Sequence, residues 1–519
     1  MVFILAPATL VLMVVVVLAA ALKEIVRRRN EKQCANVTSK SRRSEDLEIA
    51  RPATAPGPKA LPIFGNIFNL AKYGDCPYEG FTALAKEYGP VYSLYLGSNH
   101  AVVISSIDTI KEVLVTKGNM FDARPNIIRF GLYFGGDRQH SLALCDMNTV
   151  QKKRINLARS VLMFRTGESH SFDKFQENVI SEMPTLTDEI DKVLNKPVKA
   201  KELLSYCAMN IFTGFICSTK FDYSDPAFRD LARKFDFVFE DINNGHPTDF
   251  LPWLAPFFCT YLKDIQDVAA QIRQIILEKI CNDKYKQLKC DPTNIKDLAD
   301  AYFANLLNEN KDNETWDWQA ILYIIEDLLG GSSAIGNIVM RIFGYVLQNP
   351  HVCEKLRAEI DEKIGRTQAP KMNDKSEMIY TQAVVFEVLR LTSSPIVPHV
   401  ATADTTIGGY AVEKGAIVLP NIFGINTDEE LWDEPEKFMP ERFIVDGQLK
   451  KPGHFIPFST GKRACVGSKV VGYITFMVIS TVFQKYDVSL PEGVTPVLPK
   501  GKISLPWNSF ELVFSKREQ

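Results

Sequence analysis

The segment Phe458-Ser-Thr-Gly-Lys-Arg-Ala-Cys465-Val-Gly467 holds a single cysteine between two glycines. Apolar and small residues fill positions 470 to 483 and predict a buried helix directly after it. A cysteine just before a helix lies at the positive end of the helix dipole, which favours the thiolate form. Gly461 and Gly467 permit tight turns that bring backbone N–H groups toward the sulfur. The segment therefore predicts a thiolate ligand for iron; the alternative is an inert buried cysteine beside a solvated turn.

The same segment fits the pattern Phe-x-x-Gly-x-Arg-x-Cys-x-Gly at each defined position. The matching residues are Phe458, Gly461, Arg463, Cys465 and Gly467. On these residues the chain resembles the cytochrome P450 family, and the resemblance extends over the chain beyond residue 56. It implies a mainly α, helix-rich fold with small β-sheets and a haem b (iron protoporphyrin IX) cofactor. Cys465 would be the axial ligand of the iron, Phe458 and Gly461 would contact the haem, and Arg463 would bind a propionate. A thiolate ligand favours O–O cleavage at haem iron.

Composition restricts the other classes of function. The chain has 519 residues, 46% of them hydrophobic, and a net charge of −2, which argues against a nucleic-acid-binding protein. Its length allows about three domains, but no change of composition follows residue 60, so one large domain is expected. The ten cysteines include no C-x-x-C pair. This usage predicts reduced thiols in the cytosol rather than disulfides or a zinc site.

The first residues predict a membrane anchor. Val2 to Leu22 carry no charge and would span about 30 Å as a helix, enough to cross a bilayer. Arg27 to Arg29 follow, so the positive-inside rule places the rest in the cytosol. We expect an anchor at 1–22, a polar linker at 23–55 and a catalytic domain at 56–519, at the endoplasmic reticulum (microsomal) membrane. The alternative is a cleaved signal peptide. The glycosylation sequons at Asn36 and Asn313 would then stay unmodified.

Periodicity and turn residues outline the catalytic domain. Pro56-Gly-Pro58 resembles the proline-rich hinge of microsomal cytochromes P450, although an ordinary loop would read the same way. A short helix is predicted at 78–88, with strands at 91–96 and 101–104. Long amphipathic helices are predicted at 318–348 and 350–364, and short β segments near 399–419.

Two short motifs are expected to brace the cysteine loop. Glu387-Val-Leu-Arg390 places an acid and a base three residues apart, where they can pair on one helix face. It precedes Pro440-Glu-Arg442-Phe443. The resemblance implies that Glu387, Arg390 and Arg442 form a structural network that holds this region. The alternative is a set of surface ion pairs of little value.

The haem propionates require cations. The resemblance assigns Arg463 to one of them, and His399 matches a position that carries Arg or His for the same purpose; a plain structural histidine is the alternative. The family's Trp-x-x-x-Arg is missing, because Met147 and Gln151 occupy those positions. The following cations, Lys152, Lys153 and Arg154, are candidates to replace it.

The helix expected to handle oxygen departs from the family. The family pattern is Ala/Gly-Gly-x-Asp/Glu-Thr-Thr, and this chain has Gly330-Gly-Ser-Ser-Ala334-Ile335. Matching the glycine pair places Ser333 at the acid and Ala334 at the threonine, so the usual proton relay is absent. Gly331, Ser332, Ser333 and Ala334 are the candidate catalytic segment. Each glycine inside a helix costs about 1 kcal/mol, which suggests close approach of a ligand; a kinked core helix is the alternative.

Several segments together resemble the arthropod Halloween cytochromes P450 of the spook/spookier type, which are implicated in an early step of ecdysteroid biosynthesis from 7-dehydrocholesterol. Besides the glycine pair, these segments are Ser141-Leu-Ala-Leu-Cys-Asp146, Asn244-Gly-His-Pro247, Asp249-Phe-Leu-Pro252-Trp253 and Ser393-Ser-Pro-Ile-Val-Pro-His-Val-Ala401. The resemblance implies a monooxygenase acting on a sterol intermediate.

The resemblance also implies partners. Electrons would come from NADPH through NADPH-cytochrome P450 reductase, which Lys152, Lys153 and Lys462 can meet, although a solvated basic face is an alternative. Ile396 and Val397 are expected to line the substrate site, and residues 250–258 to form a membrane-facing access loop. Two other functions stay open: a haem-thiolate isomerase or dehydratase that needs no O2, and a non-catalytic haem- or sterol-binding protein.

Overall fold

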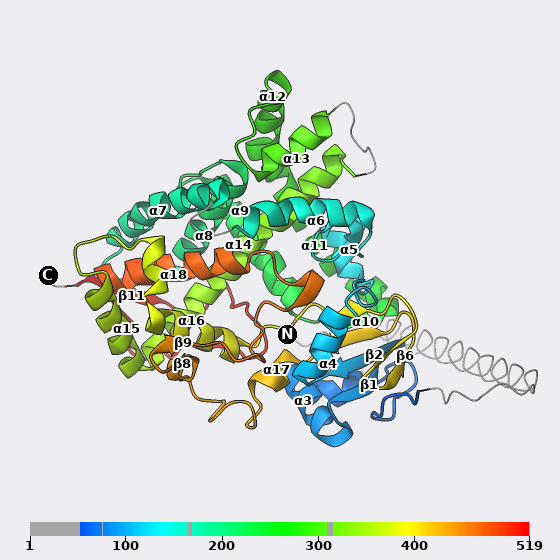
Figure 1. The fold of residues 1–519 in the computed structure, drawn as a ribbon. Helices are drawn as coiled ribbons and strands as arrows, with labels where there is room; N and C mark the ends of the chain where they lie inside the picture. Colours follow the sequence, from blue (N-terminus) through cyan, green and yellow to red (C-terminus); the bar gives the residue numbers. More distant parts are fainter. Residues whose placement is uncertain (1–51, 75, 165–168, 309–314, 518–519) are drawn as a thin grey trace, which may run out of the picture.

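A computed structural model describes residues 52–74, 76–164, 169–308 and 315–517. Most of the helices gather around α14 and α18; the strands at 91–104 and 410–412 lie at the lower right of the view, and the strand at 512–516 lies at the left (Figure 1). The α-helices are α2 (Ile67–Ala71), α3 (Pro77–Tyr88), α4 (Ile107–Lys111), α5 (Ile128–Tyr133), α6 (Thr149–Leu162), α7 (His170–Asp191), α8 (Ala200–Cys217), α9 (Pro226–Asn243), α10 (Pro247–Phe250), α11 (Cys259–Ile276), α12 (Asn282–Cys290), α13 (Leu298–Leu307), α14 (Trp318–Gln348), α15 (Pro350–Lys363), α16 (Ile379–Thr392), α17 (Ile422–Asn426) and α18 (Ser468–Lys485). The 3-10 and π turns are η1 (Glu112–Thr116), η2 (Arg138–His140), η3 (Pro252–Phe258), η4 (Leu277–Cys281), η5 (Met372–Ser376), η6 (Pro440–Phe443) and η7 (Gly461–Arg463). The helix-rich fold with small sheets is as expected.

The long helix α14 runs through the main core. Its N-cap is Asp317, whose side chain accepts a hydrogen bond from the N–H of Ala320 at 2.8 Å. The helix packs against α8, α9, α16 and α18, which bury most of its side chains. The predicted helices at 318–348 and 350–364 are confirmed as α14 and α15. The helix predicted after the cysteine is confirmed as α18.

Eleven strands form four small sheets within the described residues. They are β1 (Val91–Leu96), β2 (Asn99–Ile104), β3 (Pro197–Val198), β4 (His399–Val400), β5 (Thr405–Ile407), β6 (Tyr410–Val412), β7 (Ile417–Pro420), β8 (Ile444–Val445), β9 (Gln448–Leu449), β10 (Tyr486–Ser489) and β11 (Leu512–Lys516). The largest sheet has the order β1-β2-β7-β4: β1 and β4 are antiparallel to their neighbours, and β2 is parallel to β7. The predicted strands at 91–96 and 101–104 are confirmed, with β2 beginning at Asn99.

The sheet edge brings His399 into the interior. His399 lies opposite Val418 of β7, and its side chain is buried. The preceding residues of this stretch take part in two different apolar clusters: Ile396 packs with the cluster around β2 and β7, and Val397 with the cluster of α5 and α11. The segment 396–400 therefore spans the boundary between the sheet and the helices.

The expected anchor at Val2 to Leu22 and the sequons at Asn36 and Asn313 lie outside the described residues. In the part of the chain that is described, no helix is both long and apolar enough to cross a membrane. Near the start of that part, Thr54 forms a parallel bridge with Ala411 of β6, and Ala55 is buried.

Candidate active site

Cys465 lies three residues before Ser468, the first residue of α18. Its own N–H donates to the carbonyl of Phe458 at 3.0 Å, which closes the loop. Burial raises the pKa of the Cys465 thiol, and the backbone N–H groups of Gly467 and Ser468 lower it by pointing at the sulfur. The side chain is exposed by area although desolvation has the largest effect on its pKa. The accessible surface and the strong desolvation agree if the sulfur faces a space inside the protein. A thiolate that binds a metal requires this arrangement.

The two glycines of this loop differ. Gly461 has a φ of +73°, and a Cβ there would lie 1.9 Å from the carbonyl oxygen of Leu114, so only glycine fits. Gly467 has a φ of −88°, and a Cβ there would meet nothing nearer than the Cys465 sulfur at 3.9 Å. The tight turns expected at both glycines thus require glycine only at Gly461, because the backbone of Gly467 lies in a region open to all residues.

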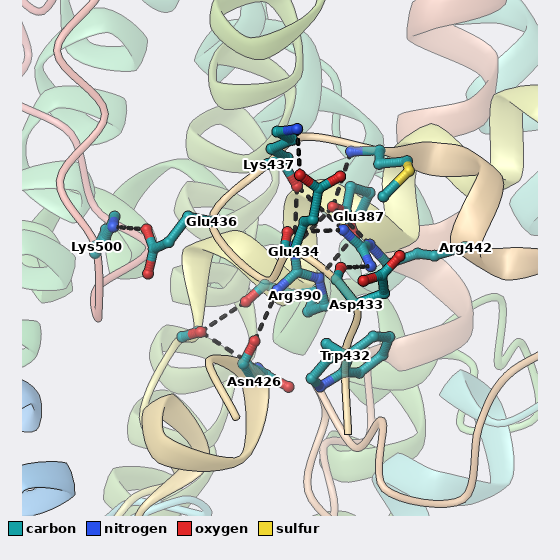
Figure 2. A network of polar contacts seen from close by, with 12 residues as sticks. Glu387, Arg390, Asn426, Trp432, Asp433, Glu434, Glu436, Lys437, Arg442 and Lys500 are labelled. Carbon is teal, nitrogen blue, oxygen red and sulfur yellow. Dashed lines mark hydrogen bonds and ion pairs between the residues drawn. The ribbon is translucent and has the colours of Figure 1, made fainter. Parts of the chain in front are cut away.

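Glu387, Arg390 and Arg442 lie in contact, as expected (Figure 2). The Glu387 carboxylate accepts from Arg390 Nε at 2.8 Å and Nη2 at 2.7 Å, and from Arg442 Nε at 3.0 Å. It also accepts from the N–H of Met439 at 3.0 Å. The Arg390 guanidinium lies 5.2 Å from the centre of the Trp432 ring. All three charged side chains are buried, so each needs the others to offset its loss of water.

This network fastens α16 to the chain that leads into the cysteine loop. Arg390 Nη1 donates to the carbonyl of Asn426 at 2.7 Å, and Arg442 Nη1 donates to that of Asp433 at 2.7 Å. Backbone carbonyls of the 426–437 stretch thereby gain partners that no regular ladder provides. Glu387, Arg390 and Arg442 therefore hold this stretch against α16.

The segment Gly330 to Ala334 lies in the middle of α14. Asp327, Gly331 and Ala334 keep accessible surface, although the neighbouring Leu328, Ser332 and Ser333 are buried. Positions three residues apart share a helix face, so Gly331 and Ala334 mark the side of α14 that keeps accessible surface; Asp327, on the same side, is covered by the Ser141–Ala143 stretch. A Cβ at Gly331 would lie 3.4 Å from the Phe212 ring, which is ordinary contact, so the glycine adds room rather than avoiding a clash.

The two serines of this segment make different contacts. Ser332 Oγ donates to the carbonyl of Leu329 at 2.7 Å and contacts the sulfur of Met209 at 3.5 Å, so it points toward α8. The carbonyl of Ser333 accepts from Asn337 Nδ2 at 2.8 Å. Asn337 in turn donates to Asp236 of α9 at 2.9 Å. This geometry favours Ala334 and Gly331 over Ser332 as the residues that face a ligand.

Asp327 has a structural role that the motif comparison does not indicate. Its Oδ2 accepts from Ser141 Oγ at 2.8 Å and from the N–H groups of Leu142 at 2.7 Å and Ala143 at 3.1 Å. Burial raises the pKa of Asp327, and these three donors lower it. These hydrogen bonds hold the Ser141-Leu-Ala-Leu-Cys-Asp146 segment against α14. They give a structural reason for the serine at the start of this pattern.

Two arginines donate hydrogen bonds to backbone carbonyls of the same segment. Arg463 Nη2 donates to the carbonyls of Ala143 at 2.7 Å and Cys145 at 3.0 Å. Arg124 donates through Nε to Ala143 at 3.1 Å and through Nη1 to the carbonyls of Val397 at 2.9 Å and Pro398 at 3.1 Å. The segment thus links α14 to the cysteine loop and to the edge of β4.

His399 lies beside these arginines. Its Nδ1–H donates to the carbonyl of Phe121 at 2.6 Å, and its Nε2 is buried without a partner among the described residues. Burial, together with the charges of Arg124 and Arg463, lowers the pKa of His399 to about 3. The imidazole is therefore neutral, and its free Nε2 can accept a hydrogen bond but cannot donate one.

Comparison with known proteins shows the family of the chain. Residues 55–514 match the description Cytochrome P450. The chain belongs to the cytochrome P450 family. It is similar to Cytochrome P450 307a1 of Drosophila melanogaster, with 38% identity over 491 residues, 90% of this chain and 89% of that protein. Cytochrome P450 2U1 of Homo sapiens is 28% identical over 445 residues (84% and 80%). Steroid 17-alpha-hydroxylase/17,20 lyase of Cavia porcellus is 29% identical over 448 residues (84% and 86%).

The chain is thus a cytochrome P450 monooxygenase, and its residues fit the haem that this family carries. Cys465 offers an accessible sulfur with backbone donors behind it, and Phe458 lies partly buried at the same loop. Arg463 and Arg124 are the cations that would hold the propionates, and the buried Nε2 of His399 has no partner among the described residues. A neutral imidazole would bind a carboxylate only after taking a proton, so the arginines are the better propionate ligands. When bound, haem supplies the iron at which molecular oxygen is activated.

Arg124 was missed by the motif search, and the suggested substitutes differ in their surroundings. Lys152 is exposed on α6 and acts mainly on Asp122, whose pKa it lowers against the effect of burial. Arg154 is buried, with Nε donating to the carbonyl of Thr315 at 2.9 Å, so it serves the packing of α6. Gln151 is buried on α6 and donates to the carbonyl of Gln139. In the sequence, Arg124 stands in Asp122-Ala-Arg124-Pro125. No chemical rule marks an arginine in such a stretch as a haem ligand, so the sequence holds no usable signal for it.

Proposed function

We propose that this cytochrome P450 is a haem-thiolate monooxygenase that acts on a sterol intermediate early in ecdysteroid biosynthesis, starting from 7-dehydrocholesterol. The observation that carries the proposal is the 38% identity to Cytochrome P450 307a1 over nearly the whole chain, together with the segments that resemble the Halloween type. The similarity to steroid 17-alpha-hydroxylase/17,20 lyase proteins supports a steroid-like substrate.

The open face of α14 suits a large apolar substrate. Gly331 and Ala334 have almost no side-chain volume. A Cβ at Gly330 would lie 3.5 Å from the Phe235 ring of α9, an ordinary contact distance. Such a surface excludes water by apolar contact and leaves room for a rigid ring system. It also lacks the hydroxyl and carboxylate that normally relay protons, so a proton would reach the site through Ser333, through water, or from a hydroxyl of the substrate itself.

A membrane location fits the apolar surface near the start of the described chain. Leu61 is 50% exposed and Phe68 is 56% exposed. The Phe64 ring packs 6.2 Å from that of Trp253, within the expected access loop at 250–258. We propose an endoplasmic reticulum protein anchored by Val2 to Leu22. Protease treatment of intact microsomes should remove the catalytic domain and neither sequon should carry sugar; a protected, glycosylated chain would reverse this topology.

We propose NADPH-cytochrome P450 reductase as the electron donor, because exposed cations surround the cysteine loop. Lys152 is exposed on α6, and Lys462 is exposed within the loop. Arg159 of α6 donates to the carbonyl of Lys462 and so joins the two elements. Charge reversal at Lys152 and Lys462 should slow electron transfer at low ionic strength and leave turnover driven by an added peroxide unchanged.

The test of the proposed function is incubation of reconstituted enzyme with 7-dehydrocholesterol, with and without NADPH and reductase, followed by product analysis. A product that requires NADPH, O2 and reductase supports the monooxygenase on this substrate. A product formed without them would favour an isomerase or dehydratase, a reading that the missing acid and threonine permit. Tight sterol binding with no product under either condition would favour a binding protein.

A further inference from the structure

Arg129 of α5 is a buried cation with an unusually complete set of partners. Its side chain is 2% exposed. Nε donates to Asp249 Oδ1 at 2.8 Å and Nη2 to Asp249 Oδ2 at 2.5 Å, which is a bidentate pair. Nη1 donates to Asp241 Oδ2 at 2.5 Å and to the Asp241 carbonyl at 2.8 Å. Nη2 also donates to the carbonyl of Asn244 at 2.9 Å.

These partners belong to the stretch that connects α9 to α11. Asp241 is near the end of α9, Asn244 is its C-cap, and Asp249 lies in α10. Two tyrosines complete the cluster: Tyr133 of α5 and Tyr261 of α11 both donate to Asp241, Tyr261 at 2.5 Å. The Asn244-Gly-His-Pro247 and Asp249-Phe-Leu-Pro252-Trp253 patterns therefore meet at one buried guanidinium, a use that the monooxygenase chemistry does not explain.

Outside this cluster, the 244–258 segment is held by apolar and ring contacts: Thr248 and Leu251 are buried, and the His246 ring stacks on that of Tyr261 at 4.3 Å. None of the residues of η3 is buried. The segment touches the sheet at the β1–β2 turn, where a Cβ on Gly97 would lie 2.1 Å from the carbonyl of Phe250. Asn244 Oδ1 accepts from Lys502 Nζ at 3.1 Å. The Arg129 cluster is the part of these contacts that joins the segment to α5 through buried charges.

The cluster also fixes two helices that flank the open face of α14. Phe235 of α9 packs at Gly330, and Phe134, directly after α5, packs 6.2 Å from the ring of Tyr323 on α14. Arg129 joins the same two elements through Asp241. Separating α9 from α5 would open the space over Gly331 and Ala334 from the side on which the 244–258 segment lies.

We propose that Arg129 is a positioning residue that holds the 244–258 segment closed beside the α14 face, and so sets how fast an apolar substrate reaches and leaves the site. This deepens the proposed function and rests on it only for the identity of the substrate. Because the cluster contains two carboxylates and one cation, loss of Arg129 leaves two buried negative charges together, which drives the segment outward.

The test uses the haem-loaded protein in four forms: wild type, Arg129→Met, the milder Asp249→Asn, and Arg129→Lys. Lys284→Met is the matched control, since Lys284 is a buried cation paired with Asp297 and with Asp300 at 2.9 Å, away from this segment. Hydrogen exchange of amides 244–258 should be about 100-fold faster in Arg129→Met and about tenfold faster in Asp249→Asn, with Arg129→Lys in between. The Lys284 control should leave it unchanged.

Ligand kinetics separate this role from the proposed function. Dissociation of the bulky azole ketoconazole from the haem iron should accelerate in the same order as the exchange, while carbon monoxide binding should change less than twofold. If 7-dehydrocholesterol binds to none of the forms, wild type included, while azole dissociation follows this order, the substrate assignment is wrong and the role of Arg129 stands. Unchanged exchange and azole dissociation in both Arg129→Met and Asp249→Asn would overturn the proposal; if Arg129→Met does not fold, Asp249→Asn decides alone.

Discussion

Glu387 and Arg442 are 55 residues apart in the chain, yet Arg442 Nε lies 3.0 Å from Glu387 Oε1, and the carboxylate is completely buried. The same oxygen accepts from Arg390 and from the N–H of Met439. One carboxylate thus joins α16, the stretch before η6 and η6 itself, all of which precede the cysteine loop. The arrangement explains how the loop gains a rigid base without a regular sheet beneath it.

Glu387→Ala leaves two buried guanidinium groups without a counter-charge, so it should lower the free energy of unfolding by about 3–5 kcal/mol. Lys355→Ala is the control, because the Lys355–Glu441 pair, at 2.6 Å, is half exposed and should contribute at most about 1 kcal/mol. Denaturant titration with haem absorbance and far-ultraviolet circular dichroism measures both. Equal effects of the two substitutions would show that the network is only a surface feature.

Cys465→Ser should abolish the thiolate-type spectrum of the reduced carbon monoxide complex, because it removes the sulfur at which the backbone N–H groups of Gly467 and Ser468 point. Cys145→Ser is the control: this cysteine is buried and its sulfur lies 3.8 Å from Arg463 Nη1, away from the start of α18. The control should keep the spectrum. Survival of the spectrum in Cys465→Ser would refute the ligand assignment.

Ala334→Thr should weaken sterol binding by about tenfold or more, because it adds volume to an open face that is shaped for a large ligand. Turnover should fall as well. Ser332→Ala should change neither, since that hydroxyl donates to the Leu329 carbonyl on the other side of α14. Binding titrations and the ratio of product to NADPH consumed are the measurements, with hydrogen peroxide release as a check on coupling. General acid assistance contributes about 10²–10⁴-fold, so a marked gain in coupled turnover with unchanged binding would contradict this expectation.

Arg124→Gln should weaken haem retention by about tenfold or more, because it removes a charge-assisted donor from the propionate side of the site. Arg138→Gln is the control: Arg138 is bonded to the carbonyl of Leu144 at 2.9 Å and to Asp146 at 2.7 Å, in the same loop but without a contact to the 397–398 carbonyls. Haem transfer to an acceptor apoprotein measures retention. An Arg124 variant that retains haem as firmly as the control would exclude Arg124 as a propionate ligand.

His399 provides a pH dependence. Its pKa is lowered to about 3 in the fold from an ordinary 6.5, so the unfolded chain takes up a proton that the folded protein refuses. The stability is therefore fully present above pH 6.5 and is lost as the pH falls toward 3, by at most about 1.4 kcal/mol per pH unit. His399→Asn should flatten this acid limb between pH 6.5 and 4 in thermal unfolding. An identical limb in both proteins would show that the imidazole is already protonated when folded.

The sequence alone determined those features whose signals are local. The bounds of α14 and α18, the β1–β2 hairpin and the pairing of Glu387 with Arg390 follow from periodicity, caps and spacing within a few residues. The resemblance of the cysteine segment indicated the ligand, and the altered Gly330 to Ala334 segment indicated an unusual distal side. Only the tertiary structure decided the rest. It showed that Gly467 is unstrained, that Ser332 points to α8 and that Asp327 holds the Ser141 to Ala143 stretch. It also decided the hydrogen-bond partners of Arg124 and Arg129. An arginine side chain is long, and its guanidinium has five N–H donors that follow no local sequence pattern. Its partners therefore depend on which distant backbone segments the packing brings within its reach.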